Sequence, residues 1–401
     1  MPDQPLDGQP LDDREMTPEE RAEARRYRQV GLACEVADKL LDVAYLAVMA
    51  LLLARPLDAC LRGAAWLSDN ETLRLIVLYL IVFALHVVVS FPLSFYSGHV
   101  VEHRFGLSTQ SFARWLGRYA KRMGIAMVFA LAMFVGLFWV IWLSGPWWWL
   151  AAAAVFFVVS VLMGQLFPVF ILPLFYKIQP LEDPQLSERI EAIAEPAGLA
   201  IEGTYRMDLS VETVKANAML AGLGRTRRVL LGDTLLENFS PKEILVVFAH
   251  EVGHHAHRHL PKMLLAGLLV SVVGLWLCDR TLAAWLVATA GSFQYGQLPV
   301  FALPMIMLVL TLFGLVFEPL QNTMSRHFER QADRYAVERT GMPEAFRSAF
   351  RKLARLNKDD PDPPRLEVWL WHSHPPIAER VAMAGEEQRA RSETRRVKSE
   401  E

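Results

Sequence analysis

The sequence contains only three cysteines, Cys34, Cys60 and Cys278, and they lie far apart along its 401 residues. This spacing predicts neither a disulfide framework nor a zinc site built from thiolates. The formal net charge is only −2, so the charge balance indicates no nucleic-acid partner. The first residues, MPDQPLDGQPLDDREM, also lack the basic and apolar regions of a secretory signal peptide.

Charged residues are missing from long stretches of the chain. Asp, Glu, Lys and Arg do not occur in residues 75–101 or in residues 123–176. The first stretch is long enough for one membrane span, and the second is long enough for two spans with a break at Ser144-Gly145-Pro146. Together with 53% hydrophobic residues and a mean hydropathy of +0.23, these stretches predict an integral membrane protein.

Three weaker apolar stretches complete a prediction of about six spans, four before a polar middle segment and two after it. These stretches are 40–62, 263–278 and 281–317. Asp42, Arg55 and Asp58 interrupt the first of them. Within the last, residues 298–317 make the best span, and 281–292 is expected to form a short additional membrane element.

The loops between the predicted spans indicate an orientation. Residues 99–122 are rich in arginine and lysine, whereas the turn at 144–146 carries no charge. The positive-inside rule therefore places the basic loop in the cytoplasm. Six spans then put the N-terminus, the polar segment 177–262 and the chain after residue 318 on that same side. We expect a multi-pass protein of the plasma or inner membrane if it is bacterial, and of the endoplasmic reticulum if it is eukaryotic.

The polar middle segment predicts a small α+β unit. Residues 184–198 have helical periodicity, residues 204–208 read as a strand, and 218–223 with 228–231 read as a β-hairpin. Ser240-Pro241-Lys242-Glu243 then provides an N-cap, a first-turn proline and a capping-box glutamate. A helix is therefore predicted to begin at residue 241.

That helix carries the motif HEVGHH and, with the residues just after it, five of the eleven histidines. His250 and His254 are four residues apart, so their rings lie on one helix face and could share one metal ion. Glu251 would then lie beside a metal-bound water rather than on the metal. The alternative interpretation is a solvated, histidine-rich helix end.

A catalytic zinc ion needs a third protein ligand. His257 is one turn beyond His254, but about 10 Å of helix rise separates it from His250. On a continuous helix, His255 and His259 point away from the face of the pair. The third ligand is therefore expected to come from another helix.

The strongest candidate for that ligand lies in FERQADRYA, residues 328–336. Glu329 and Asp333 share one helix face, which would supply a ligand and a carboxylate that orients a ligating histidine. The alternative is a surface acidic face paired with Arg330 or Arg334. Glu318 is a weaker candidate because it lies at the membrane end of a span.

Several segments carry a resemblance to a known family. They are HEVGHH, then SRHFERQAD after a membrane span, then SHPP within WHSHPPIAER, together with PLFYKIQPLED and ANAMLAGLGRTRRVLLGDTLL. In this order, over about residues 92–381, they resemble the type I CAAX prenyl protease family of integral-membrane zinc metalloproteases. The heat-shock membrane metalloproteases are more distant relatives of that family.

The resemblance implies specific roles at one Zn²⁺ site per chain. The implied zinc ligands are His250, His254 and Glu329. Glu251 would be the general base, and Asp333 would support a ligand.

The resemblance also implies residues that meet the substrate. His374 would bind the tetrahedral intermediate, with Arg380 supporting the site. Without the resemblance, His372 and His374 would be interpreted as loop residues. Asn217 and Ala218 map onto the strand that would hold an extended substrate by strand addition; taken alone, Asn217 fits a turn residue equally well.

The chain departs from the family pattern near the implied substrate path. Val211 and Glu212 stand where a small, basic segment is usual, and Met219 stands where an aromatic residue is usual. His255 replaces a common tryptophan, and Ser108 replaces a frequent asparagine. Catalysis is therefore better indicated than the identity of the substrate.

The predicted fold is a mostly α-helical, polytopic membrane protein with a small α+β, zincin-like metalloprotease domain on the cytoplasmic side. The predicted segments are a polar N-terminal segment (1–38), a four-span membrane region (39–176), a first catalytic part with the HExxH helix (177–262), a two-helix membrane region (263–318), a second catalytic part with the third ligand (319–385) and a disordered charged tail (386–401).

The predicted function is that of a membrane-embedded zinc metalloendopeptidase, with the lipid bilayer and a peptide or protein substrate as partners. The substrate class suggested by the resemblance is a prenylated C-terminus. The alternatives are a general quality-control protease for membrane proteins and a non-catalytic, zinc-binding membrane scaffold or transporter.

Overall fold

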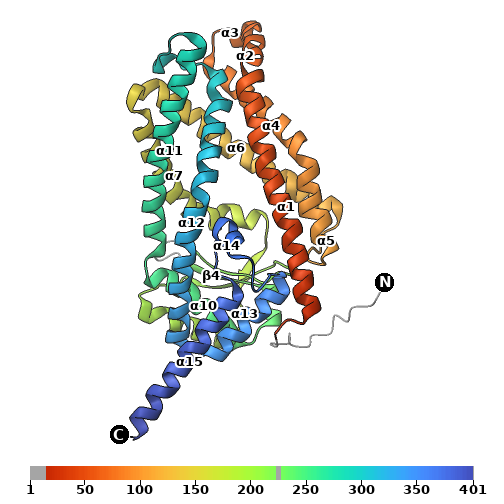
Figure 1. Cartoon of the computed structure of the whole chain (residues 1–401), viewed down its shortest axis with the longest axis vertical. Coiled ribbons are helices and arrows are strands. Elements are labelled where there is room, and N and C mark those ends of the chain that lie inside the picture. Colours follow the sequence, from red (N-terminus) through yellow and green to blue (C-terminus); the bar gives the residue numbers. More distant parts are fainter. Residues whose placement is uncertain (1–14, 223–226, 401) are drawn as a thin grey trace.

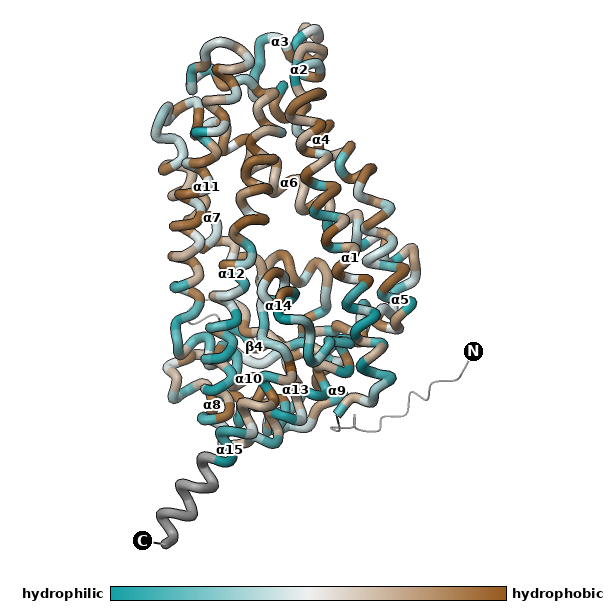
Figure 2. The backbone as a smooth tube through the Cα atoms, viewed as in Figure 1, coloured by the Kyte–Doolittle hydropathy of each residue, from teal (hydrophilic) through white to brown (hydrophobic). Residues whose placement is uncertain are grey.

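Long helices form one end of the molecule, and a smaller mixed domain forms the other (Figure 1). The computed structural model describes residues 15–222 and 227–400. In these residues, five helical segments are long and apolar enough to cross a membrane, and apolar residues are concentrated along them (Figure 2). These segments are Pro18–Arg62, Glu71–Arg104, Phe112–Leu174, His259–Ala290 and Val300–Thr340. The third contains two helices joined at Gly145–Trp147, which agrees with the expected polytopic protein of about six spans.

The membrane region consists of nine helices of very different lengths among the described residues. They are α1 (Pro18–Val48), α2 (Ala54–Arg62), α3 (Ala65–Ser68), α4 (Glu71–Phe95), α5 (Glu102–Arg104), α6 (Phe112–Ser144), α7 (Trp148–Leu166), α11 (His259–Ala290) and α12 (Leu303–Thr340). Short π-helical segments continue α1, α4 and α7 at Met49–Leu53, Tyr96–Val101 and Phe167–Ile171. The 3₁₀ turns of this region are Gly145–Trp147, Leu172–Leu174, Tyr295–Gln297 and Val300–Ala302.

Two of the charges that interrupt the first predicted span are paired with residues of α4. Asp42 Oδ1 lies 2.7 Å from His86 Nε2 on α4. Asp58, which is buried, lies 2.8 Å from Arg74 Nε. Because each carboxylate has a partner from a neighbouring helix, the chain remains helical through this stretch with only a local π-helical segment.

The predicted short membrane element at 281–292 is wrong, because most of it is the end of α11. That helix continues to Ala290 and stops at Gly291, which has a φ of 77°. Asp279 and Arg280 separate this element from the apolar stretch 263–278 in the sequence. In the structure Asp279 is buried and accepts hydrogen bonds from Trp148 Nε1 (2.8 Å) and Tyr295 Oη (2.9 Å). A satisfied carboxylate can stay within the helix, so it causes no interruption.

The mixed domain contains a four-stranded sheet in the order β1-β2-β4-β3. The strands are β1 (Ile178–Pro180), β2 (Gly203–Met207), β3 (Ala218–Ala221) and β4 (Arg228–Gly232). β2 and β4 are parallel, and β3 and β4 form the predicted antiparallel hairpin. Most of the hairpin turn lies outside the described residues. Because β3 has only one neighbouring strand among the described residues, its other edge is open to pairing with an extended chain.

Helices pack around this sheet. They are α8 (Pro184–Ala194), α9 (Asp233–Asn238), α10 (Pro241–Ala256), α13 (Pro343–Asn357), α14 (Arg365–Trp371) and α15 (Ile377–Glu400), with a 3₁₀ turn at Glu195–Ala197. The predicted helices at 184–198 and from 241 are confirmed. From residue 386, where a disordered tail was expected, the structure instead continues α15 to Glu400. This stretch has no glycine or proline and is rich in strong helix formers.

The helices α10 and α12 approach each other very closely. A Cβ atom added at Gly253 would lie 2.9 Å from the Cα atom of Ala332, closer than a side chain tolerates. Only glycine therefore allows the two helices to meet at this level. Gly253 lies within one turn of the HEVGHH histidines, and Ala332 lies within one turn of Glu329, so this contact determines how near those side chains come.

The beginning of α10 is fixed by a buried ion pair. Ser240 and Glu243 form the predicted capping box. Glu243 Oε2 also lies 2.9 Å from Lys352 Nζ on α13, and both residues are buried. Glu243→Ala would leave the Lys352 charge buried without a partner, so the free energy of unfolding is expected to fall by about 3–5 kcal/mol. Chemical denaturation of the detergent-solubilised variant measures this change. The double variant Glu243→Ala/Lys352→Met should regain part of the loss, and a single variant as stable as wild type would contradict the role of the pair.

Because of the Glu243 carboxylate, the folded protein is also expected to lose stability in acid. Burial acts to raise the pKa of Glu243, but hydrogen bonds from Ser348 and Lys352 outweigh it, and the pKa lies below the ordinary value of 4.5. A group with a depressed pKa in the folded state stabilises the fold above its unfolded pKa. This contribution is therefore complete above about pH 4.5 and is lost as the pH falls through the lower, folded pKa.

Candidate metal centre

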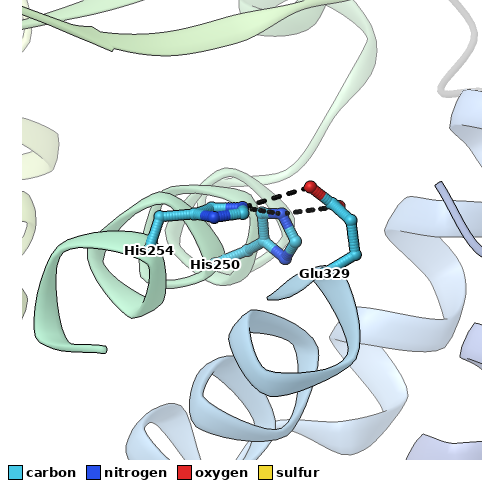
Figure 3. Close-up of side chains that lie close together, drawn as sticks. All are labelled: His250, His254 and Glu329. Atoms are coloured by element: carbon cyan, nitrogen blue, oxygen red, sulfur yellow. Dashed lines mark hydrogen bonds and ion pairs between the residues drawn. The ribbon is translucent and has the colours of Figure 1, made fainter. Parts of the chain in front are cut away.

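Three side chains from two helices converge at one point (Figure 3). His250 and His254 come from α10, and Glu329 comes from α12. His250 Nε2 lies 3.1 Å from His254 Nε2 and 3.3 Å from Glu329 Oε2. His254 Nε2 lies 3.3 Å from Glu329 Oε1. The i, i+4 spacing on α10 puts both rings on the face that α12 covers.

These distances fit the ligand set of a tetrahedral zinc ion. Bonds of about 2.0–2.2 Å from zinc to nitrogen and oxygen place tetrahedral ligands about 3.3–3.5 Å apart. In addition, Glu329 Oε2 is buried and receives no hydrogen bond of good geometry among the described residues, although His250 Nε2 and Arg380 Nη2 lie 3.3 and 3.6 Å away. A buried carboxylate oxygen without a partner is costly unless a cation satisfies it. Two imidazoles and one carboxylate also match the donor set of catalytic zinc sites.

A carboxylate on α12 orients the first histidine. Asp333 Oδ1 lies 2.9 Å from His250 Nδ1, and Arg380 Nε donates to Asp333 Oδ2 at 2.8 Å. Burial acts to lower the pKa of His250, but hydrogen bonds to Asp333 and Glu329 outweigh it and raise the pKa to about 9. The Arg380 guanidinium in turn lies 3.9 Å from the centre of the Phe350 ring. Asp333 therefore fixes the ring so that Nε2 faces Glu329.

A cavity of about 620 Å³ opens beside these side chains. Its lining includes seven of the residues with implied roles, which are His250, Glu251, Glu329, His374, Arg380, Asn217 and Ala218. Burial raises the pKa of the Glu251 carboxyl above its usual range, while the neighbouring histidines oppose the shift. A carboxylate with a raised pKa is better suited to accept and return a proton near neutral pH.

The residues implied to meet the substrate lie on the wall of this cavity. His374 Nε2 is 3.6 Å from Glu329 Oε1, and its side chain is 62% exposed. Asn217 and Ala218 lie at the start of the edge strand β3, where the Asn217 carbonyl accepts a hydrogen bond from Gly232 N (3.0 Å). The structure therefore brings all nine predicted site residues to one cavity or to the side chains that form its wall.

Other candidates for the third ligand have different partners. Glu318 lies 2.7 Å from Lys39 on α1. Arg330, which was considered as a partner for an exposed acidic face, instead lies 2.5 Å from Glu379. Glu329 and Asp333 are 5% and 1% exposed, so they do not form a solvated surface.

The prediction that His259 points away from the pair is wrong. It assumed a continuous helix, but α10 ends at Ala256, and Arg258 has a φ of 53°. The chain turns there and α11 begins, which brings His259 Nδ1 to 3.0 Å from His254 Nδ1. Pro261 was the available signal, because a proline at that position cannot continue a helix running through residue 257. His259 is the residue near the centre that the sequence analysis missed.

Two of the residues that depart from the family pattern, Glu212 and Ser108, make specific contacts in the structure. Glu212 Oε2 accepts hydrogen bonds from Arg118 and from the Tyr176 hydroxyl. Ser108 forms an isolated β-bridge with Thr213. The Arg118 contact ties the segment before β3 to α6, and the Ser108 bridge ties it to the loop that precedes α6.

Comparisons with known proteins identify the family of the chain. Residues 180–388 match the model of peptidase family M48, and residues 9–177 match the model of the CAAX prenyl protease N-terminal region, described as five membrane helices. The chain is 30% identical to YhfN of Bacillus subtilis, described as an uncharacterized metalloprotease, over 81% of this chain and 77% of that protein. It is 31% identical to CAAX prenyl protease 1 of Saccharomyces cerevisiae, over 74% of this chain and 69% of that protein.

The fold also has a match among solved structures. The crystal structure of S. mikatae Ste24p superposes with a TM-score of 0.81 at 23% identity, covering 94% of this chain and 92% of that chain. Taken with the two family matches, which cover most of the sequence, the site and the membrane helices lead to one conclusion: the chain belongs to peptidase family M48 and, within it, to the CAAX prenyl protease family of membrane metalloproteases.

Proposed function

We propose that the chain is a zinc endopeptidase in which His250, His254 and Glu329 hold the metal and Glu251 is the general base. The single observation that carries the proposal is the convergence of these ligand groups beside a cavity that Glu251 also lines. The two histidine Nε2 atoms lie 3.1 Å apart, and each lies 3.3 Å from a different oxygen of the Glu329 carboxylate. A zinc ion bound there would supply a Lewis acid and lower the pKa of a water molecule towards 7.

The chain's own residues would carry the proton transfers. Glu251 would take the proton of the attacking water and deliver it to the leaving amine. His374, whose Nε2 lies 3.6 Å from Glu329, would donate a hydrogen bond to the oxyanion of the tetrahedral intermediate. A donor of this kind contributes roughly 2.7–4 kcal/mol to catalysis. Arg380 and Asp333 would act through His250 by holding its ring in place.

The edge strand would position the substrate. β3 pairs with β4 on one side only, and Asn217 and Ala218 line the cavity at its beginning. An extended peptide could therefore add to the sheet as a further strand, held by main-chain hydrogen bonds. We propose that the two catalytic parts, 177–262 and 319–385, form one site that faces the cytoplasm, because the basic loop at 99–122 belongs on that side.

The proposed substrate class is a membrane-associated C-terminus that carries a prenyl group. Relatives whose names describe CAAX prenyl proteases, such as that of Saccharomyces cerevisiae, support this proposal. Glu329 also lies on α12, which belongs to a segment long and apolar enough to cross a membrane, and this placement suits a substrate held at the bilayer surface.

The test compares a farnesylated CAAX peptide with its unmodified twin. The detergent-purified protein is incubated with each peptide, with Glu251→Gln as the blank, and the products are measured by mass spectrometry. We expect cleavage of the farnesylated peptide and little or none of the twin. Equal cleavage of both would favour a general quality-control protease. No cleavage above the blank, in protein that holds zinc, would favour a non-catalytic scaffold.

A further inference from the structure

The Nδ1 atom of His254, the second histidine of the motif, contacts another histidine, whereas the Nδ1 atom of His250 contacts a carboxylate. His254 Nδ1 lies 3.0 Å from His259 Nδ1. His259 Nε2 lies 2.8 Å from Gln331 Oε1, and Gln331 Nε2 lies 3.1 Å from His327 Nε2. The series runs from α10 through the start of α11 to α12, so it connects three elements around the metal centre.

The chemistry of the imidazole ring determines which atom donates and which accepts in each hydrogen bond of this series. His254 Nε2 faces His250 and Glu329, so Nε2 is the atom available to a metal and Nδ1 must carry the proton. That proton can be donated only if His259 Nδ1 is an acceptor, which makes His259 the tautomer protonated at Nε2. The Nε2–H group of His259 then donates to Gln331 Oε1. Every contact in the series therefore has one donor and one acceptor when His254 presents a bare Nε2.

The His259 ring has little freedom to move. His259 is 1% exposed, and its ring stacks on Phe328 with centroids 4.3 Å apart and an angle of 13° between the planes. It is the first residue of α11, directly after Arg258 in the left-handed region. A buried and stacked ring can fix the orientation of its hydrogen-bond partner. A direct metal-ligand role does not fit, because His259 approaches the nitrogen of His254 that faces away from Glu329.

We propose that His259 is a positioning residue that accepts the Nδ1–H of His254 and so holds its Nε2 towards the metal, with Gln331 fixing the tautomer of His259. This inference rests on the proposed zinc site. It assigns different supports to the two histidine ligands, an aspartate for His250 and a neutral histidine for His254. Mutation of a residue that hydrogen-bonds to a metal ligand commonly lowers the metal affinity by about 10–100-fold.

The test uses two substitutions at the same position in the full-length protein. His259→Phe keeps an aromatic ring against Phe328 but removes the acceptor. His259→Asn places an amide oxygen close to the former Nδ1 position and restores the acceptor. Zinc affinity is measured by competition with a chromophoric chelator, and the visible spectrum of the Co²⁺-loaded protein reports the ligand geometry. His257→Phe is the matched control, because His257 is exposed and phenylalanine keeps an aromatic ring stacked on His259.

We expect His259→Phe to bind zinc about 10–100-fold more weakly and to change the Co²⁺ spectrum. His259→Asn should recover most of the affinity, and His257→Phe should behave as wild type. Wild-type affinity and spectrum in His259→Phe would overturn the proposal. It would also be overturned if His259→Asn bound zinc as weakly as His259→Phe and both lowered the melting temperature of the metal-free protein, since this would indicate a packing role.

Two variants at Gln331 provide an independent test if His259→Phe does not fold. Gln331→Leu removes the acceptor for His259 Nε2–H, and Gln331→Glu retains one, so only the leucine variant should lose zinc affinity. Equal affinities in the two variants would contradict the assignment. Failure of the zinc site itself would look different, because the wild-type protein would bind neither Zn²⁺ nor Co²⁺, or His250→Ala would bind them unchanged.

Discussion

Glu251→Gln is expected to lower the rate of peptide hydrolysis by a factor of about 10²–10⁴, the usual contribution of a positioned general base. Glutamine has nearly the same shape, but its amide cannot accept the proton of the attacking water. The three ligand atoms belong to other side chains, so metal binding should be unchanged. Single-turnover rates with the farnesylated peptide and the metal content of the purified protein, measured by mass spectrometry, test both parts of this expectation.

The control for Glu251→Gln is the same substitution at Glu188, which is exposed on α8 and is not among the residues that line the cavity. That variant should cleave the peptide at the wild-type rate. A Glu251→Gln protein that retained zinc and also retained its activity would exclude Glu251 as the base. Loss of zinc together with activity would mean that Glu251 supports the metal rather than the proton transfer.

Local patterns were sufficient to predict much of the site. The i, i+4 spacing fixes the relation between His250 and His254 within one helix. The capping box at Ser240 and Glu243 fixes where that helix begins. Both features depend on residues a few positions apart, so helix geometry alone determines them. The β3–β4 hairpin was predicted for the same reason, because its two strands are adjacent in sequence.

Contacts between distant segments were harder to predict. The series from His254 through His259 to Gln331 depends on a helix break at Arg258 and on the packing of α11 against α12, and periodicity describes neither. The carboxylate of Asp279 interrupted an apolar run in the sequence, yet partners from Trp148 and Tyr295 allow α11 to continue. β1 is only three residues long and has no pattern of its own, since it exists by pairing with β2.

Asp333→Ala should damage both stability and metal binding. Asp333 is 1% exposed, and it contacts both the buried Arg380 and His250 Nδ1. Its removal leaves a buried guanidinium without its main partner, which is expected to cost about 3–5 kcal/mol in the free energy of unfolding. Zinc affinity is expected to fall by about 10–100-fold, because His250 loses the acceptor that orients its ring. Chemical denaturation and chelator competition measure the two effects separately.

A second variant separates the two consequences of losing Asp333. Arg380 Nη2 already lies 3.6 Å from Glu329 Oε2, so without Asp333 it would compete with the metal for that carboxylate. The double variant Asp333→Ala/Arg380→Met removes both the unpaired charge and this competition. It should regain stability and part of the zinc affinity, but not all of it, because His250 Nδ1 still lacks an acceptor. Glu379→Ala breaks only the exposed pair with Arg330 and should change stability by no more than about 1 kcal/mol. If Asp333→Ala resembled Glu379→Ala in both measurements, Asp333 would have no part in holding His250.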